Sequence, residues 1–234
     1  MSEIAENLAR VRARVADATR RSGRHDGDVE LMVVSKTSPA EVVQEAVDAG
    51  QVIFGENRLQ EGEAKIPVMS PELEWHFIGT LQSNKVRKVL SIFPVVHSVS
   101  SLKLARFVDR IAGELGAQPK VFLEVNLAGE ESKGGFREQE LFEEVETFCS
   151  FENFDWRGLM AIPPRAETPE DGRRWFAKMR ELQEELRVRS GRALPELSMG
   201  MSGDYEVAIE EGSTIVRVGS AIFGQRAAWN PKTL

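Results

Sequence analysis

The sequence has very little cysteine and no long apolar run. Cys149 is the single cysteine among 234 residues, which excludes an internal disulfide and is typical of a reducing compartment. No segment approaches the roughly 20 apolar residues of a membrane-spanning helix. Residues 1–28 also lack the apolar core of a secretory signal. We therefore expect a cytoplasmic protein with no membrane partner.

Metal-ligating and nucleotide-binding motifs are also missing. The three histidines lie far apart and, with one cysteine, give no metal-ligand spacing. No P-loop or G-x-G-x-x-G pattern occurs. The net charge is -7 and no long basic block stands out, which argues against a nucleic-acid partner. We expect no metal site.

The chain does contain a regular alternation of apolar segments and amphipathic helical segments. This alternation predicts a parallel sheet, and eight is the strand number at which such a sheet closes into a TIM barrel. We therefore predict an α/β fold, a single (β/α)8 barrel, with a doubly wound open sheet as the alternative. The expected strands are roughly residues 30–35, 51–54, 74–78, 94–99, 120–125, 154–159, 195–198 and 214–218.

No linker, repeat or low-complexity tract divides the series, so residues 1–234 are predicted to form one domain. Residues 1–29 are expected to form an extra helix and a linker, residues 30–224 the barrel, and residues 225–234 a polar tail. The helix carries an apolar stripe at Ile4, Leu8, Val11, Val15 and Ala18. It should cover an end or a flank of the barrel.

The first predicted strand ends on Lys36. Ser38, Pro39 and Glu41 then match a capping box with proline at the first helical position. A lysine between a buried strand and the positive end of a helix is disfavoured as an ammonium ion. Lysines that form Schiff bases are activated in this way. The alternative is a solvated lysine at a strand end.

The segments after the seventh and eighth strands suggest an anion site. Ser202 and Gly203 follow one strand, and Gly219 and Ser220 follow the other. Barrel enzymes often hold a phosphate between these two loops. Ordinary helix capping by Ser202 and Ser220 is the alternative.

Arg217 lies inside the eighth predicted strand, where a buried guanidinium needs a partner. That partner could be a carboxylate such as Glu206 or Glu210, or a ligand atom. A Schiff-base lysine with a phosphate site fits either a sugar-phosphate aldolase or pyridoxal phosphate binding. An arginine beside a pyridine nitrogen would keep that nitrogen unprotonated. Arg217 therefore favours the cofactor, with modest carbanion chemistry.

Several segments, in this order and over nearly the whole chain, resemble the YggS/PROSC family of pyridoxal phosphate homeostasis proteins. They are residues 34–37, 54–57, 75–79, 81–85, 97–99, 158–160, 197–202 and 216–219.

The resemblance implies a barrel similar to the N-terminal domain of alanine racemase, with pyridoxal 5'-phosphate held as a covalent aldimine on Lys36. It places Arg217 at the pyridine nitrogen, and Asn57 and Met160 along the ring. It assigns the phosphate to Ser202, Gly203, Gly219 and Ser220. The chain departs from the common family pattern at Arg58, Gly203–Asp204 and Ser220, and the first departure leaves the contact of residue 58 open.

The resemblance also implies a binder without robust catalysis. Pyridoxal racemases use two bases on opposite faces of the cofactor, and in alanine racemase the second is a tyrosine from an additional domain. The chain ends at Leu234, and its one tyrosine is Tyr205. We expect no catalytic residue, a monomer, and pyridoxal phosphate and its apo-enzyme acceptors as partners. A weak amino-acid racemase and a Schiff-base aldolase are the alternatives. His76 and His97 are expected to be core histidines.

Overall fold

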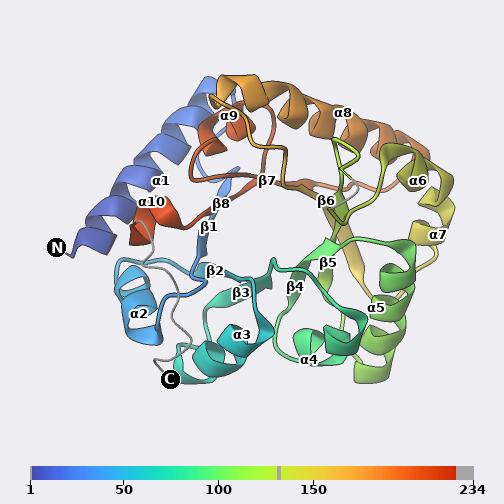
Figure 1. The fold of residues 1–234 in the computed structure, drawn as a ribbon, viewed down its shortest axis with the longest axis horizontal. Helices are drawn as coiled ribbons and strands as arrows, with labels where there is room; N and C mark the ends of the chain where they lie inside the picture. Colours follow the sequence, from blue (N-terminus) through green and yellow to red (C-terminus); the bar gives the residue numbers. More distant parts are fainter. Residues whose placement is uncertain (1, 131–132, 225–234) are drawn as a thin grey trace.

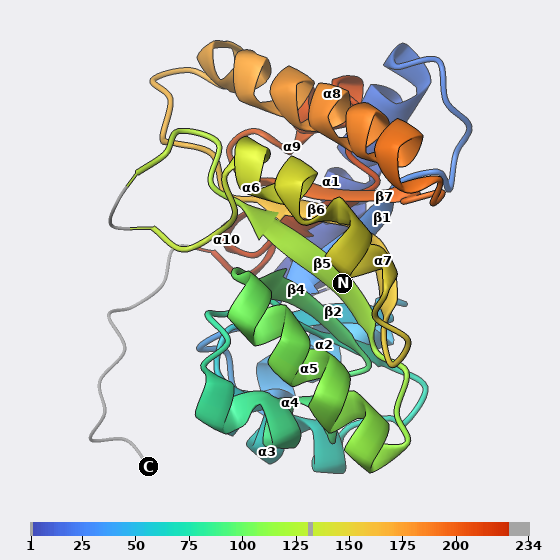
Figure 2. The same cartoon turned by 90° about the vertical axis from the view of Figure 1, so that its right-hand side faces the viewer.

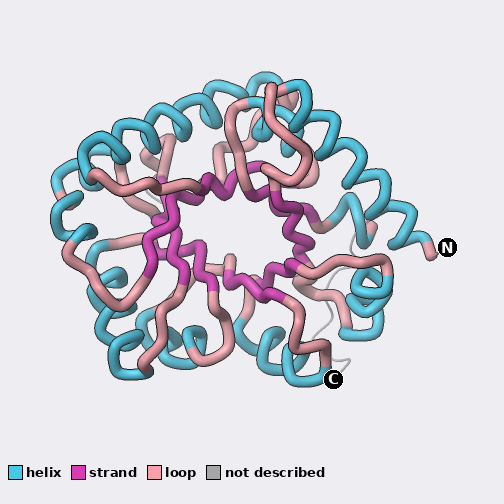
Figure 3. The backbone as a smooth tube through the Cα atoms, turned by 180° about the vertical axis from the view of Figure 1, so that it is seen from behind, coloured by secondary structure: helices cyan, strands magenta, loops and turns pink. Residues whose placement is uncertain are grey.

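The computed structural model describes residues 2–130 and 133–224, and the predicted tail lies outside these residues. Eight parallel strands close into one barrel in chain order, and helices surround it (Figure 1; Figure 3). The predicted (β/α)8 barrel is confirmed, and the open-sheet alternative is wrong because β1 pairs with β8. The strands are β1 (Glu30–Val34), β2 (Ile53–Glu56), β3 (Glu74–Phe77), β4 (Val95–Val99), β5 (Lys120–Val125), β6 (Asp155–Ala161), β7 (Glu196–Met201) and β8 (Ile215–Val218).

Helices follow the strands around the outside of the barrel (Figure 2). The α-helices are α1 (Glu3–Arg21), α2 (Ala40–Asp48), α3 (Leu59–Lys65), α4 (Val86–Leu90), α5 (Leu102–Leu115), α6 (Glu138–Glu143), α7 (Val145–Cys149), α8 (Arg173–Ser190), α9 (Tyr205–Glu210) and α10 (Ser220–Phe223). Short 3-10 helices are η1 (Ile66–Val68), η2 (Ser83–Lys85) and η3 (Glu170–Gly172).

Two separate apolar cores follow from the alternation of side chains along each strand. A small buried cluster, Met32, Val95, Phe122, Met160 and Ile215, fills the barrel interior. The larger cluster packs between the barrel and its helices, and it includes residues next to the interior ones, such as Val33 and Val96. Most of the apolar burial therefore lies outside the barrel, which leaves its interior open to polar groups.

The N-terminal helix α1 flanks the barrel, as predicted, and lies beside α9 and α10 (Figure 1). Its buried face consists of Leu8, Val11, Val15, Ala18 and Thr19. Arg21 Nε donates to Glu210 Oε1 at 2.9 Å on α9, and Asn7 Nδ2 donates to Ile222 O at 3.0 Å on α10. Because α9 and α10 follow β7 and β8, α1 braces the part of the barrel that carries the predicted phosphate loops.

Between β1 and α2 the structure corrects the predicted capping box. Helix α2 begins at Ala40, Pro39 is its N-cap residue, and no side chain caps it. Ser38 instead closes a turn, in which its N–H donates to Ser35 O at 3.1 Å. Thr37 takes a left-handed conformation in this turn, with φ of 65°. The local motif fails because contacts from outside the segment determine the turn, as described below.

Within residues 2–130 and 133–224, no helix is both long and apolar enough to cross a membrane. In the same ranges, no three His, Cys, Asp or Glu side chains gather into a group that could hold a metal ion.

Candidate functional site

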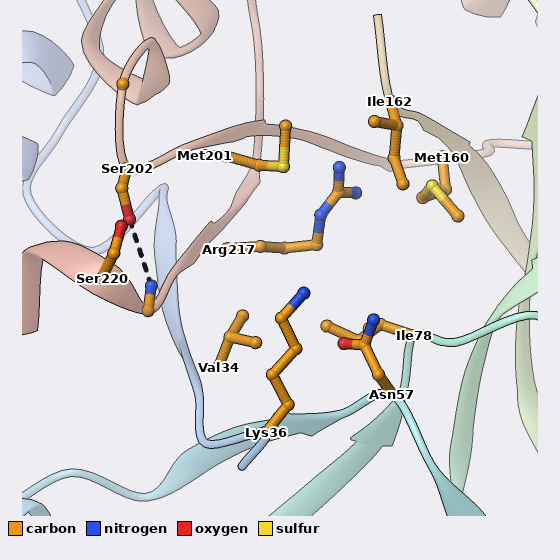
Figure 4. Close-up of a pocket in the computed structure, with 12 residues that line it drawn as sticks. Val34, Lys36, Asn57, Ile78, Met160, Ile162, Met201, Ser202, Arg217 and Ser220 are labelled. Carbon is orange, nitrogen blue, oxygen red and sulfur yellow. Dashed lines mark hydrogen bonds between the residues drawn. The ribbon is translucent and has the colours of Figure 1, made fainter. Parts of the chain in front are cut away.

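A cavity of about 320 Å³ opens at the carboxyl ends of the strands (Figure 4). Its size is within the range of small-molecule sites. All of the predicted cofactor residues line it: Lys36, Asn57, Met160, Ser202, Gly203, Arg217, Gly219 and Ser220. The fold therefore brings together residues from five strand ends that are separated by up to 184 positions in the sequence.

Lys36 and Asn57 follow β1 and β2, and both side chains face this cavity (Figure 4). Gly79 allows Asn57 to take its place, because a Cβ at position 79 would lie 1.8 Å from Asn57 O. Asn57 Oδ1 is buried and has no hydrogen-bond partner within the described part of the chain. An unsatisfied buried acceptor is costly, so a donor group on a ligand would relieve that cost.

The loops after β7 and β8 meet at Ser202. Its Oγ accepts from Gly219 N at 3.2 Å and from Ala221 N at 3.4 Å (Figure 4). The hydroxyl thus accepts from the first N–H groups of α10, and it does not cap α9, the helix that follows it in the chain. The same contact joins the two loops into one rim of the cavity. Gly200, with φ of 91°, supports this rim because a Cβ there would lie 2.6 Å from Ala208 Cβ on α9.

Arg217 projects from β8 into the barrel and is 5% exposed. Its NH1 donates to Ser198 O at 2.7 Å and Ser198 Oγ at 2.8 Å, and its NH2 donates to Ala161 O at 2.8 Å. These contacts use three of the five guanidinium N–H groups.

Of the two alternatives for the partner of Arg217, the carboxylates Glu206 and Glu210 are therefore wrong. Glu206 and Glu210 instead pair with Arg21 on the outer surface. Burial lowers the pKa of Arg217 to about 10, although the charges of Asp204 and Glu124 oppose this shift. Arg217 thus presents a buried positive charge, with no contacting carboxylate among the described residues, to whatever occupies the cavity.

A buried chain of polar side chains continues from Arg217 through the barrel. Ser198 Oγ lies 2.9 Å from His97 Nδ1, and His97 Nε2 lies 2.9 Å from His76 Nδ1. His76 Nε2 lies 3.3 Å from Glu74 Oε1, without the alignment of a hydrogen bond. Both histidines are buried, which confirms them as core residues. We call Arg217, Ser198, His97 and His76 the barrel chain.

The surroundings of the barrel chain favour one arrangement of its protons. A carboxylate beside His76 Nε2 favours the proton on that nitrogen, so His76 Nδ1 accepts from His97 Nε2–H. His97 Nδ1 then accepts from the Ser198 hydroxyl, while Arg217 donates to Ser198 Oγ. Burial first, and then the charges of His76 and Arg217, hold the pKa of His97 well below its usual range. His97 is therefore neutral.

Sequence reasoning missed four apolar residues of the cavity: Val34, Ile78, Ile162 and Met201. Each lies at or beside the carboxyl end of a strand, where an apolar residue looks like core. They could have been predicted from their positions in the chain, because each is at or next to a strand end whose residues were already candidates for the site. They give the cavity the apolar walls that a flat ring requires.

The geometry defines a class: a closed parallel barrel whose binding site lies at the carboxyl ends of its strands, with a lysine and a buried arginine inside it. Residues 4–227 match the sequence model of the alanine racemase N-terminal domain. Curated relatives match over almost their full lengths. The chain belongs to the alanine racemase N-terminal domain family and, within it, to the pyridoxal phosphate homeostasis proteins.

The individual relatives support both levels of this assignment. The pyridoxal phosphate homeostasis protein of Aquifex aeolicus is 45% identical over 94% of this chain and 97% of that protein. The Escherichia coli K12 protein of the same name is 42% identical over 97% and 98%. PipY of Synechococcus elongatus, solved with pyridoxal phosphate bound, has 41% identity and a TM-score of 0.85, covering 94% of this chain and 100% of PipY. An alanine racemase of Clostridium difficile, at 16% identity and a TM-score of 0.69, shares the fold.

Proposed function

We propose that the chain binds pyridoxal 5'-phosphate through a Schiff base on Lys36 and takes part in vitamin B6 homeostasis. The observation that carries this proposal is the convergence of Lys36, Arg217 and the Ser202–Gly219 rim on one cavity. The names of the relatives and the cofactor bound to PipY support it. When bound, the cofactor supplies an aldehyde for the lysine and a ring that can withdraw electrons.

The residues present fit this cofactor. Met160, Ile78 and Ile162 provide apolar walls for a flat ring, and Arg217 keeps two N–H groups for a ring nitrogen acceptor. Asn57 Oδ1 can accept from a ring hydroxyl. In our proposal, Ser202, Gly203, Gly219 and Ser220 hold the phosphate with hydroxyl and backbone groups.

We further propose that the protein binds the cofactor without robust turnover. Racemisation needs a base on each face of the substrate. Lys36 and Arg217 are the ionisable side chains among the described residues that line the cavity. Tyr205 is buried in α9 and does not line it. Rapid racemisation of alanine by the pure protein would refute this part of the proposal.

Absorption spectroscopy tests the Schiff base directly. Wild-type protein with pyridoxal phosphate should develop the long-wavelength absorption of a Schiff base, and borohydride should bleach it and leave the label on the Lys36 peptide. Lys36→Ala should lose both signals. Lys88→Ala is the matched control, because the Lys88 side chain is 68% exposed and lies outside the cavity lining. Label on another lysine in Lys36→Ala would contradict the assignment.

We propose a cytoplasmic monomer that supplies the cofactor to apo-enzymes. The single cysteine supports a reducing compartment. Light scattering of the loaded protein would test the monomer. Transfer to an apo-enzyme in the presence of an excess of a competing aldehyde scavenger would separate direct transfer from release into solution.

A further inference from the structure

Behind Lys36 lies a buried ion cluster that does not line the cavity. It consists of Ser35, Glu56, Glu61 and Lys65, and we call it the lysine-turn cluster. The side chains of Lys65 and Glu56 are 7% and 0% exposed. Lys65 Nζ donates to Glu56 Oε1 at 2.7 Å, to Ser35 O at 2.8 Å and to Glu61 Oε2 at 3.2 Å. All three ammonium protons therefore have acceptors.

The cluster contacts the two peptide groups that flank the Lys36 Cα. The peptide before it is held at Ser35 O by Lys65. The peptide after it is held at Thr37 N, which donates to Glu61 Oε2 at 2.6 Å. One ion pair, Lys65 with Glu61, therefore fixes the backbone on both sides of Lys36. The direction in which the Lys36 side chain leaves the backbone depends on these contacts.

The turn is not one that the local sequence favours. Thr37 has φ of 65°, a conformation that β-branched residues rarely adopt. Backbone strain of this kind persists where the surroundings hold it, and it gathers at functional sites. The charged hydrogen bond from Thr37 N to Glu61 is a contact that stabilises this conformation. Without Glu61, we expect the turn to populate other conformations.

The lysine-turn cluster is not the arrangement that stability alone would favour. A buried ion pair often contributes less to stability than a packed apolar pair of similar volume. Glu56 Oε2 is buried with no partner among the described residues, and burial raises the pKa of this carboxyl against the attraction of Lys65. The cluster is therefore better explained by the geometry it imposes on the turn than by stability alone.

We propose that Lys65 and Glu61 are positioning residues that hold the turn at residues 35–38 so that the Lys36 amine faces the carbon of an aldehyde ligand. The inference rests on the proposed function of the cavity. In the step concerned, the neutral amine adds to the aldehyde carbon and the carbonyl oxygen leaves as water, with no redox partner. Small misplacements of a reacting group can slow such a step by up to about 100-fold. The cluster thus controls how fast Lys36 captures the aldehyde.

The test compares three variants at two glutamates of α3. Glu61→Ala removes the acceptor of Thr37 N, and Glu61→Gln keeps a neutral acceptor there. Glu63→Gln is the matched control, because the Glu63 side chain is 40% exposed and its Oε1 lies 3.8 Å from Lys88 Nζ on the surface. Two measurements are made on each folded protein: amide hydrogen exchange of Thr37 without ligand, and the rate of Schiff-base absorption after mixing with pyridoxal phosphate.

We expect Glu61→Ala to exchange the Thr37 amide faster and to capture pyridoxal phosphate at least tenfold more slowly. Glu61→Gln should recover most of the rate, and Glu63→Gln should match wild type. Wild-type capture rates in Glu61→Ala would overturn this inference alone. Borohydride label absent from Lys36 in the wild type would overturn the proposed function and the inference together. Slow capture with unchanged Thr37 exchange would also overturn the positioning role.

Discussion

The two buried polar networks of the barrel handle charge in opposite ways. The lysine-turn cluster joins Lys65 to two carboxylates and neutralises its charge within the protein. The barrel chain surrounds the charge of Arg217 with carbonyl oxygens, a hydroxyl and, beyond the hydroxyl, the neutral imidazole of His97. The first network has no charge to offer a ligand and acts on the backbone. The second leaves Arg217 positively charged at the cavity, where it can donate hydrogen bonds to an acceptor on a ligand.

Removing the charge of Lys65 should have the largest effect on stability. Lys65→Met leaves Glu56 buried beside Glu61 with no cation, and breaking a buried pair in this way costs about 3–5 kcal/mol. The double variant Lys65→Met/Glu56→Leu should regain most of this loss, because it also removes the stranded carboxylate. Urea unfolding of both variants and of wild type measures the difference. A loss below about 1 kcal/mol in the single variant would contradict the buried-charge account.

The charge state of Glu56 should produce the next largest effect, through pH. Burial raises its pKa to about 7 in the folded protein, from 4.5. Between pH 4.5 and about 7, Glu56 therefore keeps its proton in the folded state and has lost it in the unfolded state. The stability from Glu56 is fully present below about pH 4.5 and is lost as the pH rises through about 7, with a slope of at most about 1.4 kcal/mol per pH unit.

Glu56→Gln is the comparison that isolates this effect. Subtracting its unfolding free energy from that of wild type cancels the other titrating groups. Glu74, whose pKa His76 lowers to about 2, loses its contribution only as the pH falls, below the window used here. A wild-type minus Glu56→Gln difference that stays flat from pH 4.5 to 7 would mean that Glu56 is ionised throughout.

Removing the charge of Arg217 should cost less than removing that of Lys65. Arg217→Met leaves the carbonyl oxygens of Ser198 and Ala161 without donors, but it strands no carboxylate in contact. Because the variant also removes a buried charge, we expect a net loss of about 1–2 kcal/mol. Pyridoxal phosphate binding should weaken much more than the fold. Urea unfolding measures the loss of stability, and absorption titration measures the loss of binding. A loss of stability as large as that of Lys65→Met would mean that the two networks do not differ in this way.

The contrast also explains what could be predicted from the sequence. Most of the strand ends could be predicted because they show a local change from apolar to polar or glycine residues, and so Lys36 and Ser202 were found. The partners of Arg217 could not, because Ala161 lies on β6 and Ser198 on β7, and the pairing of these strands in the sheet brings both near β8. The turn after Lys36 was predicted wrongly for the same reason: Glu61 and Lys65 decide it from 24 and 30 positions away.

The smallest effect should come from a neutral link of the barrel chain. Ser198→Ala removes the donor to His97 Nδ1 and one of the acceptors of Arg217, while the Ser198 carbonyl still holds the guanidinium. We expect a stability loss of about 1 kcal/mol. Nitrogen NMR of wild type should show the His97 imidazole neutral, with the proton on Nε2, and Ser198→Ala should perturb His97 most. A proton on His97 Nδ1 in wild type would reverse the chain, so that its donors point from His76 toward Arg217. Ser198 Oγ would then accept from both His97 Nδ1–H and Arg217, and the Ser198 hydroxyl proton would no longer be donated to His97.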